Sequence, residues 1–216
     1  MAEKNDPILP AVALVVSGGH TELIFVMKGS DFRRIGGTRD DAAGEAFDKV
    51  SRMLDAGYPG GPEISRLADR ATEKNLILPR AWLRGTNDFS FSGLKTAVLN
   101  LLKKEQNISK EEVAWAFQES VVDVLVSKTS KLATELNAKS VLIAGGVAAN
   151  KRLREKAFNE IKVPVFIPSP ILCTDNAAMI AAAAFNHIDE SIPAHSIVEI
   201  FSTTNRGKLL IDKKRN

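Results

Sequence analysis

The first clear pattern of apolar and polar positions lies near the start of the chain. Two runs of apolar and mostly β-branched residues, 12–16 and 23–26, enclose the polar segment Ser17-Gly18-Gly19-His20-Thr21 within AVALVVSGGHTELIFVM. Short apolar runs separated by a glycine-containing turn are typical of two paired strands. The pattern therefore predicts a β-hairpin over residues 11–27.

Helical spacing appears after a third candidate strand at residues 31–35. In DDAAGEAFDKVSRMLDA the apolar positions 43, 47, 50 and 54 fall on one helical face, which predicts a helix that opens near residues 38–41. Further along, Ser109 with Glu112 three positions later forms a capping box. This motif predicts the start of a long helix that continues to about residue 137.

The other segments show shorter patterns. In the middle of the chain we expect a short helix at 63–71, an irregular segment at 76–91, and a helix at 93–104 that is capped by Ser90 or Ser92. Towards the end we expect strands at 140–144 and 163–167 and helices at 150–160 and 177–185. Three strands followed by alternating strands and helices indicate an α/β protein, and in particular one lobe of the actin-like ATPase (ribonuclease-H-like) fold. We expect this lobe over residues 11–186, with a helical insertion at about 58–137, and an extension with a basic tail at 187–216.

Charge and composition change this picture little. The 216 residues are 44% hydrophobic and 25% charged, and the net charge is +3. The tail from residue 206 carries +4, so the remainder of the chain sums to −1 and the basic balance belongs to the tail, which is either solvated or in contact with RNA phosphates. Cys173 is the only cysteine, the start has no signal-peptide pattern, and no apolar run is long enough to span a bilayer. We expect a cytoplasmic protein without a membrane partner.

The glycine pair in the hairpin is the first candidate for chemistry. Gly18 and Gly19 leave backbone N–H groups open to approach, and the neighbouring hydroxyl groups add hydrogen-bond donors, which suits phosphate or carboxylate oxygens. The alternative is an ordinary tight hairpin in which His20 contacts only the backbone.

A carboxylate stripe on the first helix is the second candidate. Asp41, Glu45 and Asp48 share one face, with Arg52 one turn beyond them. One interpretation is a solvated face with an Asp48–Arg52 ion pair. The other is that one carboxylate accepts hydrogen bonds from ribose hydroxyl groups.

Six segments together carry a resemblance to a known family. They are VVSGGHTEL (15–23), DDAAGEAFDKV (40–50), YPGGPEI (58–64), FSFSGLKTAV (89–98), IAGGVAANKRLR (143–154) and CTDNAAMIA (173–181). In order and spacing they resemble the motifs of the TsaD family, the tRNA threonylcarbamoyladenosine transferases formerly described as O-sialoglycoprotein endopeptidases or glycoproteases.

The resemblance implies a function in tRNA modification. Its members transfer the threonylcarbamoyl group from threonylcarbamoyl-AMP to the adenosine next to the anticodon in tRNAs that read codons starting with A. The implied fold is mainly the second lobe of the actin-like ATPase architecture. The implied partners are tRNA, threonylcarbamoyl-AMP or an adenine nucleotide, accessory proteins of the pathway, and a second copy of the chain.

The resemblance also assigns site residues. Val15, Val16, Ser17, Gly18 and Gly19 would form the substrate phosphate loop, and Asp48, Gly61 and Asn150 would line the nucleotide pocket. Asp175 would be a ligand of one divalent metal, which is iron in the full-length family. Judged from position alone, Asp175 is instead a candidate N-cap of the helix at 177–185. No catalytic residue is assigned.

The resemblance covers only the C-terminal portion of the family. We expect the chain to lack the N-terminal lobe, which carries two histidines four positions apart that complete the metal site. The histidines here are His20, His187 and His195. Because firm metal sites take three or more protein ligands, we expect the metal to be absent or weakly bound. Gly37 and Arg39 depart from the family pattern before the first helix.

Several functions remain open at this point. The first is the transferase or its C-terminal lobe, and the second is a non-catalytic nucleotide-binding or scaffold lobe that pairs with other subunits. A metallopeptidase is suggested only by the older family name, because the sequence has no H-E-x-x-H helix and Ser17 with His20 is too local for a triad. An actin-like sugar kinase is opposed by the motif series.

Overall fold

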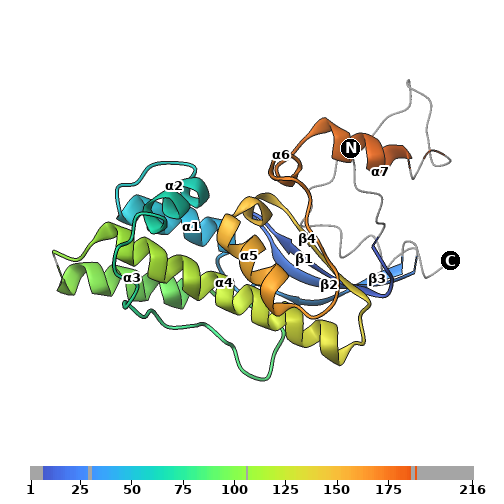
Figure 1. Ribbon diagram of the computed structural model, residues 1–216, viewed down its shortest axis with the longest axis horizontal. Helices are drawn as coiled ribbons and strands as arrows, with labels where there is room; N and C mark the ends of the chain where they lie inside the picture. The colour runs from blue at the N-terminus through green and yellow to red at the C-terminus, as the bar shows by residue number, and fades with distance from the viewer. Residues whose placement is uncertain (1–6, 29–30, 106, 186–187, 189–216) are drawn as a thin grey trace. The chain divides into compact units, whose positions relative to one another are not determined.

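The computed structural model describes residues 7–28, 31–105, 107–185 and 188 (Figure 1). The chain divides into two units, residues 1–176 and 177–216. Among the described residues the second unit contains one regular helix, α7 (Ala177–Phe185), which has the predicted bounds. The division into 11–186 and 187–216 stays a prediction, and nearly all of the expected extension and tail lies outside the described residues.

The sheet of the first unit has the strand order β3-β2-β1-β4-β5. β1 (Ala11–Val16) and β2 (Thr21–Lys28) form the predicted hairpin, and β3 (Asp31–Gly37) pairs antiparallel with β2. β4 (Ser140–Ala144) lies parallel to β1, and β5 (Val165–Phe166) lies parallel to β4. The parallel pair β1/β4 brings the turn after each of these strands to the same edge of the sheet.

β3 extends two residues beyond the predicted end, through both glycines. Gly36 and Gly37 pair with Leu23 and Glu22 of β2, and the Gly37 amide donates to Asp88 Oδ1 at 3.1 Å. A Cβ atom on Gly36 would lie 2.5 Å from the Asn87 carbonyl oxygen. These glycines therefore allow a distant loop to approach the strand closely instead of ending it.

The helices of the first unit mostly follow the predicted order. They are α1 (Ala43–Met53), α2 (Gly60–Ala68), α3 (Ser92–Lys104), α4 (Lys110–Glu135), the 3₁₀ helix η1 (Gly146–Ala149), α5 (Lys151–Glu160) and α6 (Pro170–Cys173). Ser109 caps α4 as predicted, since its Oγ atom accepts from the Glu112 amide at 3.2 Å. The turns η1 and α6 were not predicted, because short helices have no apolar periodicity to reveal them.

Three helices begin away from their predicted starts because of long-range caps. α1 begins at Ala43, whose amide donates to the Thr21 hydroxyl of β2 at 2.8 Å. α2 begins three residues early at Gly60, whose amide donates to the Asp48 carboxylate. α3 begins at Ser92, and Asp40 Oδ1 accepts from its amide at 3.3 Å and from the preceding amide at 2.8 Å. The predicted Ser90 or Ser92 cap is therefore wrong, since neither serine side chain caps α3.

One core joins the hairpin to the helices. The β1 side chains of Val12, Leu14 and Val16 are fully buried. Phe47 of α1 and Phe117 of α4 meet edge to face with ring centroids 5.1 Å apart. Because these elements share one packed core, the turns that they carry have a rigid base.

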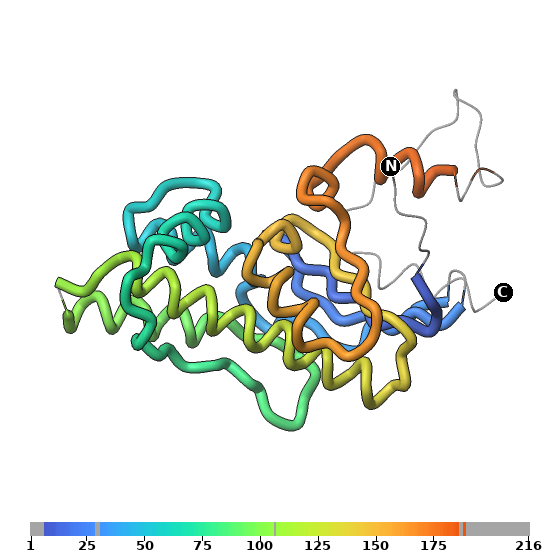
Figure 2. The backbone as a smooth tube through the Cα atoms, viewed as in Figure 1, coloured from blue at the N-terminus to red at the C-terminus, as the bar shows by residue number. Residues whose placement is uncertain are grey.

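The segment between α2 and α3 is irregular, as predicted, and runs along α4 (Figure 2). The Lys128 ammonium of α4 donates to the carbonyl oxygens of Thr86 and Asp88 at 2.9 and 2.6 Å, and Arg80 pairs with Asp123. These contacts attach the segment to the long helix. Within the described ranges, no helix has both the length and the apolar character needed to cross a membrane.

Candidate functional site

The hairpin turn is closed by its own backbone and by Ser17. The Ser17 Oγ atom accepts from the amides of Gly19 and His20 at 3.3 and 3.1 Å, and the Ser17 amide donates to the His20 carbonyl oxygen at 2.8 Å. The Ser17 hydroxyl oxygen therefore shapes the turn. The amide of Gly18 makes no hydrogen bond within the described part of the chain.

Helix α1 packs directly against this turn. The Gly44 amide donates to the Ser17 carbonyl oxygen at 3.1 Å, and a Cβ atom on Gly44 would lie 2.7 Å from that oxygen. Only glycine fits at this distance, which fixes the turn relative to the start of α1.

A cleft of about 720 Å³ lies beside the hairpin turn. Its lining comes from the hairpin, α1, α2 with its flanking residues, η1 after β4, the start of α5 and the residue after α6: Gly18, Gly44, Phe47, Asp48, Pro59, Gly61, Pro62, Ser65, Arg66, Asp69, Arg70, Gly146, Val147, Ala149, Asn150, Lys151 and Thr174. The volume is in the range of small-molecule and cofactor sites.

The cleft brings together four of the eight residues that the resemblance assigns to the substrate. Gly18, Asp48, Gly61 and Asn150 line it, although they come from four separate segments. Val15, Val16, Ser17 and Gly19 are not among the lining residues. Val16 is fully buried in the core and Ser17 is engaged in the turn, so their assignment to the substrate stays a prediction.

Asp48 does not form the ion pair expected from the sequence. Its Oδ1 atom accepts from the Gly60 amide at 2.7 Å, and no ion pair joins it to Arg52 in the described ranges. Lys49 instead pairs with Asp41 at 2.6 Å and with Glu45 at 2.8 Å. The interpretation with an Asp48–Arg52 ion pair is therefore wrong, and the carboxylate instead binds the first turn of α2.

Asp41 is the buried member of this carboxylate group. It precedes α1 and also accepts from the Lys95 ammonium of α3 at 2.9 Å. Burial alone would raise the pKa of its carboxyl group, but hydrogen bonds from Lys49 and Lys95 outweigh burial and leave the pKa below its usual value. Asp41 therefore links α1 to α3 through its ion pairs with Lys49 and Lys95.

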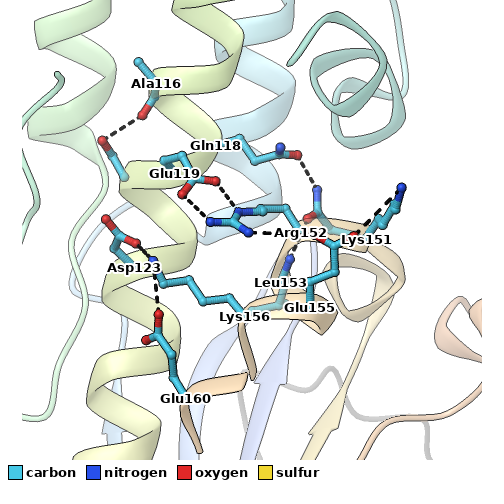
Figure 3. Close-up of polar contacts among 12 residues, drawn as sticks. Ala116, Gln118, Glu119, Asp123, Lys151, Arg152, Leu153, Glu155, Lys156 and Glu160 are labelled. Atoms are coloured by element: carbon cyan, nitrogen blue, oxygen red, sulfur yellow. Dashed lines mark hydrogen bonds and ion pairs between the residues drawn. The ribbon is translucent and has the colours of Figure 1, made fainter. Parts of the chain in front are cut away.

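Asn150 is held on two sides. Its Oδ1 atom accepts from the Leu153 amide at 3.0 Å, which caps α5, and its Nδ2 atom donates to Gln118 Oε1 at 2.8 Å. Figure 3 shows the surrounding contacts between α4 and α5, including the ion pair of Glu119 with Arg152.

Four cleft residues of α2 and of the turn directly after it were not singled out from the sequence. They are Ser65, Arg66, Asp69 and Arg70, and Lys151 adds a further cation from the start of α5. The predicted helix at 63–71 is confirmed only as far as Ala68, and the side of α2 that meets the cleft depends on how the helix packs against α1. The lining thus holds three cationic side chains and two carboxylates.

Most of the chain matches one family of known proteins. A family model described as TsaD, tRNA N6-adenosine threonylcarbamoyltransferase, matches residues 1–182. This chain belongs to the TsaD family.

TsaD proteins of several bacteria are similar to this chain. The protein of Bacillus subtilis (strain 168), named tRNA N6-adenosine threonylcarbamoyltransferase, is 54% identical over 188 residues, which cover 83% of this chain and 54% of that protein. The protein of the same name from Halalkalibacterium halodurans is 56% identical over 183 residues, covering 81% and 53%. The chain therefore spans about half the length of these TsaD relatives.

Two solved structures share the fold of this TsaD chain. HypF of T. kodakarensis matches with a TM-score of 0.66 at 12% identity, covering 83% of this chain and 34% of that one. The activator of 2-hydroxyisocaproyl-CoA dehydratase from Clostridium difficile, with bound ADPNP, matches with a TM-score of 0.52 at 15% identity, covering 88% and 67%. The predicted actin-like ATPase fold is confirmed.

The residues described for this TsaD chain do not fit a metal site. Asp175 is exposed, and no group of three or more His, Cys, Asp or Glu side chains in the described ranges is placed to share an ion. His187 and His195 lie outside those ranges. Since α7 begins at Ala177, Asn176 directly precedes the helix, and the N-cap role of Asp175 stays a prediction.

Proposed function

We propose that this chain forms one wall of the site in which a threonylcarbamoyl group passes from threonylcarbamoyl-AMP to the adenosine next to the anticodon of tRNA. One observation carries the proposal: Gly18, Asp48, Gly61 and Asn150, which the family resemblance assigns to the substrate, line a single cleft. Because the chain spans about half of its relatives, the transfer activity requires more than the residues described here.

The reaction asks for hydrogen-bond donors and positive charge. The exocyclic amine of adenosine attacks the carbamoyl carbon, a C–N bond forms, the bond from that carbon to the phosphate oxygen breaks, AMP leaves and the amine loses a proton. Negative charge develops on the carbamoyl oxygen and then on the leaving phosphate, so oriented donors at these oxygens lower the barrier.

The cleft offers such groups from several elements. The Gly18 amide has no hydrogen-bond partner within the described ranges, and Gly61 and Gly146 present backbone to the cleft without side chains. Arg66, Arg70 and Lys151 place positive charge beside them. In this proposal the backbone groups bind phosphate oxygens, and the cations stabilise the departing AMP.

Asp175 remains the proposed metal ligand from the family resemblance, with iron as the expected ion. Its other ligands would have to come from beyond the described residues. The accessory proteins remain an expectation from the resemblance, and a second copy of the chain and a cytoplasmic location also remain expectations.

A reconstituted transfer assay tests the proposal. This chain is mixed with the N-terminal half of the Bacillus subtilis relative, and transfer from threonylcarbamoyl-AMP to a tRNA transcript is measured, with a transcript lacking the target adenosine as control. We expect transfer by the mixture and none by this chain alone. Nucleotide binding without transfer by the mixture would favour the non-catalytic nucleotide-binding or scaffold lobe.

A further inference from the structure

The amide of Asn150 is fixed by a chain of hydrogen bonds that ends on α4. The Leu153 backbone amide is a donor, so the atom of Asn150 that lies 3.0 Å from it must be the oxygen. The nitrogen of Asn150 then faces Gln118, which must present its own oxygen at 2.8 Å. A backbone group thus settles the orientation of both side-chain amides.

These two hydrogen bonds leave one donor and one acceptor of the Asn150 side-chain amide unused. An amide nitrogen has two N–H groups and an amide oxygen has two lone pairs, and one of each is used by Gln118 and Leu153. Asn150 also lines the cleft, which makes the remaining N–H and lone pair candidates to bind a ligand there. Adjacent donor and acceptor groups match an adenine edge or a sugar hydroxyl.

Gln118 is buried in α4 beside an ion pair that joins α4 to α5. Its residue is 4% exposed, and a buried amide is costly unless it makes hydrogen bonds. The next residue, Glu119, is 6% exposed and accepts from Arg152 Nε at 2.5 Å and Nη2 at 2.9 Å. Bidentate pairing of this kind is directional as well as strong.

A second ion pair joins α4 to α5 one helical turn beyond the Glu119–Arg152 pair. Asp123 of α4 pairs with Lys156 of α5, as Figure 3 shows, four residues beyond Glu119 and Arg152 respectively. The two ion pairs fix α5 against α4, so Gln118 meets Asn150 at one defined position.

We propose that Gln118 is a positioning residue that orients the Asn150 amide toward an adenine nucleotide in the cleft. The inference rests on the proposed function, because that function supplies the adenine nucleotide that Asn150 would bind. Gln118 acts through Asn150 and is not among the residues that line the nucleotide cleft.

The first test needs no ligand. In NMR spectra of this chain the side-chain amide signals of Asn150 should be sharp and shifted from those of mobile asparagines, and Gln118→Met should move them to mobile values. Gln118→Glu keeps an acceptor oxygen and should retain the signals. The control is Ser120→Ala, which removes a buried hydroxyl of α4 that bonds only to Ala116 and Leu78. Unchanged Asn150 signals in Gln118→Met would overturn the proposal.

The second test measures binding of AMP by NMR titration of the same variants. We expect Gln118→Met to weaken binding about five-fold, the loss of one hydrogen bond, with Gln118→Glu close to the parent. In an Asn150→Ser background, where serine still caps α5, Gln118→Met should have no further effect. An equal loss in both backgrounds would overturn the proposal, because Gln118 would then act independently of Asn150.

The two tests separate this inference from the function on which it rests. If the parent chain binds no AMP at any concentration, the proposed function fails together with the ligand of Asn150, whatever the first test shows. If the parent chain binds AMP and Gln118→Met binds it equally well, only the positioning role fails.

Discussion

The Asp48 Oδ1 atom accepts a hydrogen bond from the Gly60 amide at 2.7 Å, and a Cβ atom on Gly60 would lie 2.5 Å from the Asp48 Cα atom. The contact joins α1 to the first turn of α2. The second carboxylate oxygen of Asp48 makes no hydrogen bond within the described ranges. One side chain of the cleft therefore stabilises the cleft wall and retains an oxygen for a ligand.

This close approach predicts different results for two adjacent glycines. Gly60→Ala should destabilise the protein by about 1–3 kcal/mol, because its methyl group meets backbone that cannot move aside cheaply. Gly61→Ala is the matched control, since no atom lies within 4 Å of its added Cβ atom. Urea unfolding of both variants measures the difference. Equal stability would contradict the packing of α2 on α1.

Adenine nucleotides should bind this chain weakly. The described cleft is bounded by one unit of the chain, and an open cleft excludes less water and makes fewer contacts than a closed pocket. We expect dissociation constants well above the micromolar range for AMP and ATP by calorimetry. Sub-micromolar binding would show that no further wall is needed.

The hairpin glycines allow a matched test of the phosphate loop. Gly18 lines the cleft and Gly19 does not, and a Cβ atom on either would meet nothing within 4 Å. Gly18→Val should therefore fold normally and reduce nucleotide binding at least about ten-fold by blocking the backbone donors. Gly19→Val should have a smaller effect. Equal losses would extend the site over the whole hairpin tip, and no loss in either variant would make the hairpin purely structural.

Stability should fall in acid because of Asp123. Burial by itself raises the pKa of its carboxyl group, but hydrogen bonds from Lys156 and Arg80 outweigh burial and lower the pKa below 3.8. A carboxylate whose pKa is depressed by folding stabilises the protein above its unfolded-state pKa, and this contribution is lost as the pH falls through the folded-state pKa.

Asp123→Asn should accordingly cost about 1.5–3 kcal/mol near neutral pH and much less once the pH falls below the folded-state pKa of Asp123. Asp55→Asn is the control, because the Asp55 side chain is 87% exposed and its ion pair with Lys110 is long, at 3.4 Å. Urea unfolding at several pH values measures both. A constant cost of Asp123→Asn across the pH range would contradict the ion-pair explanation.

Asp175 should not bind a metal firmly in this chain. The purified protein should contain no stoichiometric iron or zinc by elemental analysis, since one carboxylate is too few for a stable site. Asp175→Asn should change the free energy of unfolding little, because Asp175 is exposed and Asn176 lies between it and the start of α7. One equivalent of metal that disappears in Asp175→Asn would overturn this prediction and indicate ligands outside the described residues.

Elements whose signals are local were predictable from the sequence. The hairpin follows from two apolar runs around a glycine turn, and α4 follows from Ser109 and its neighbours. The start of α3 was not predictable, because its cap is Asp40, which lies fifty residues earlier in the chain. A cap supplied by a distant segment leaves no pattern in the helix that it caps.

The same distinction applies to the cleft. Its glycine turns were recognisable from the motif series, whereas Arg66 and Arg70 read as the polar face of an ordinary short helix. Gln118 gave no signal either, because it lies in a helix whose pattern is mainly apolar. These residues become candidates only once α2 and α5 are placed against α1 and α4.

The parallel pairing of β1 with β4 has a consequence for biosynthesis. Ala11 pairs with Ser140, so the centre of the sheet joins segments that emerge from the ribosome far apart in time. At a translation rate of about 5–20 residues per second, roughly 6–26 s separate the two strands. During this interval β1 has a partner on one edge only, and its other edge is open to pairing with a neighbouring nascent chain.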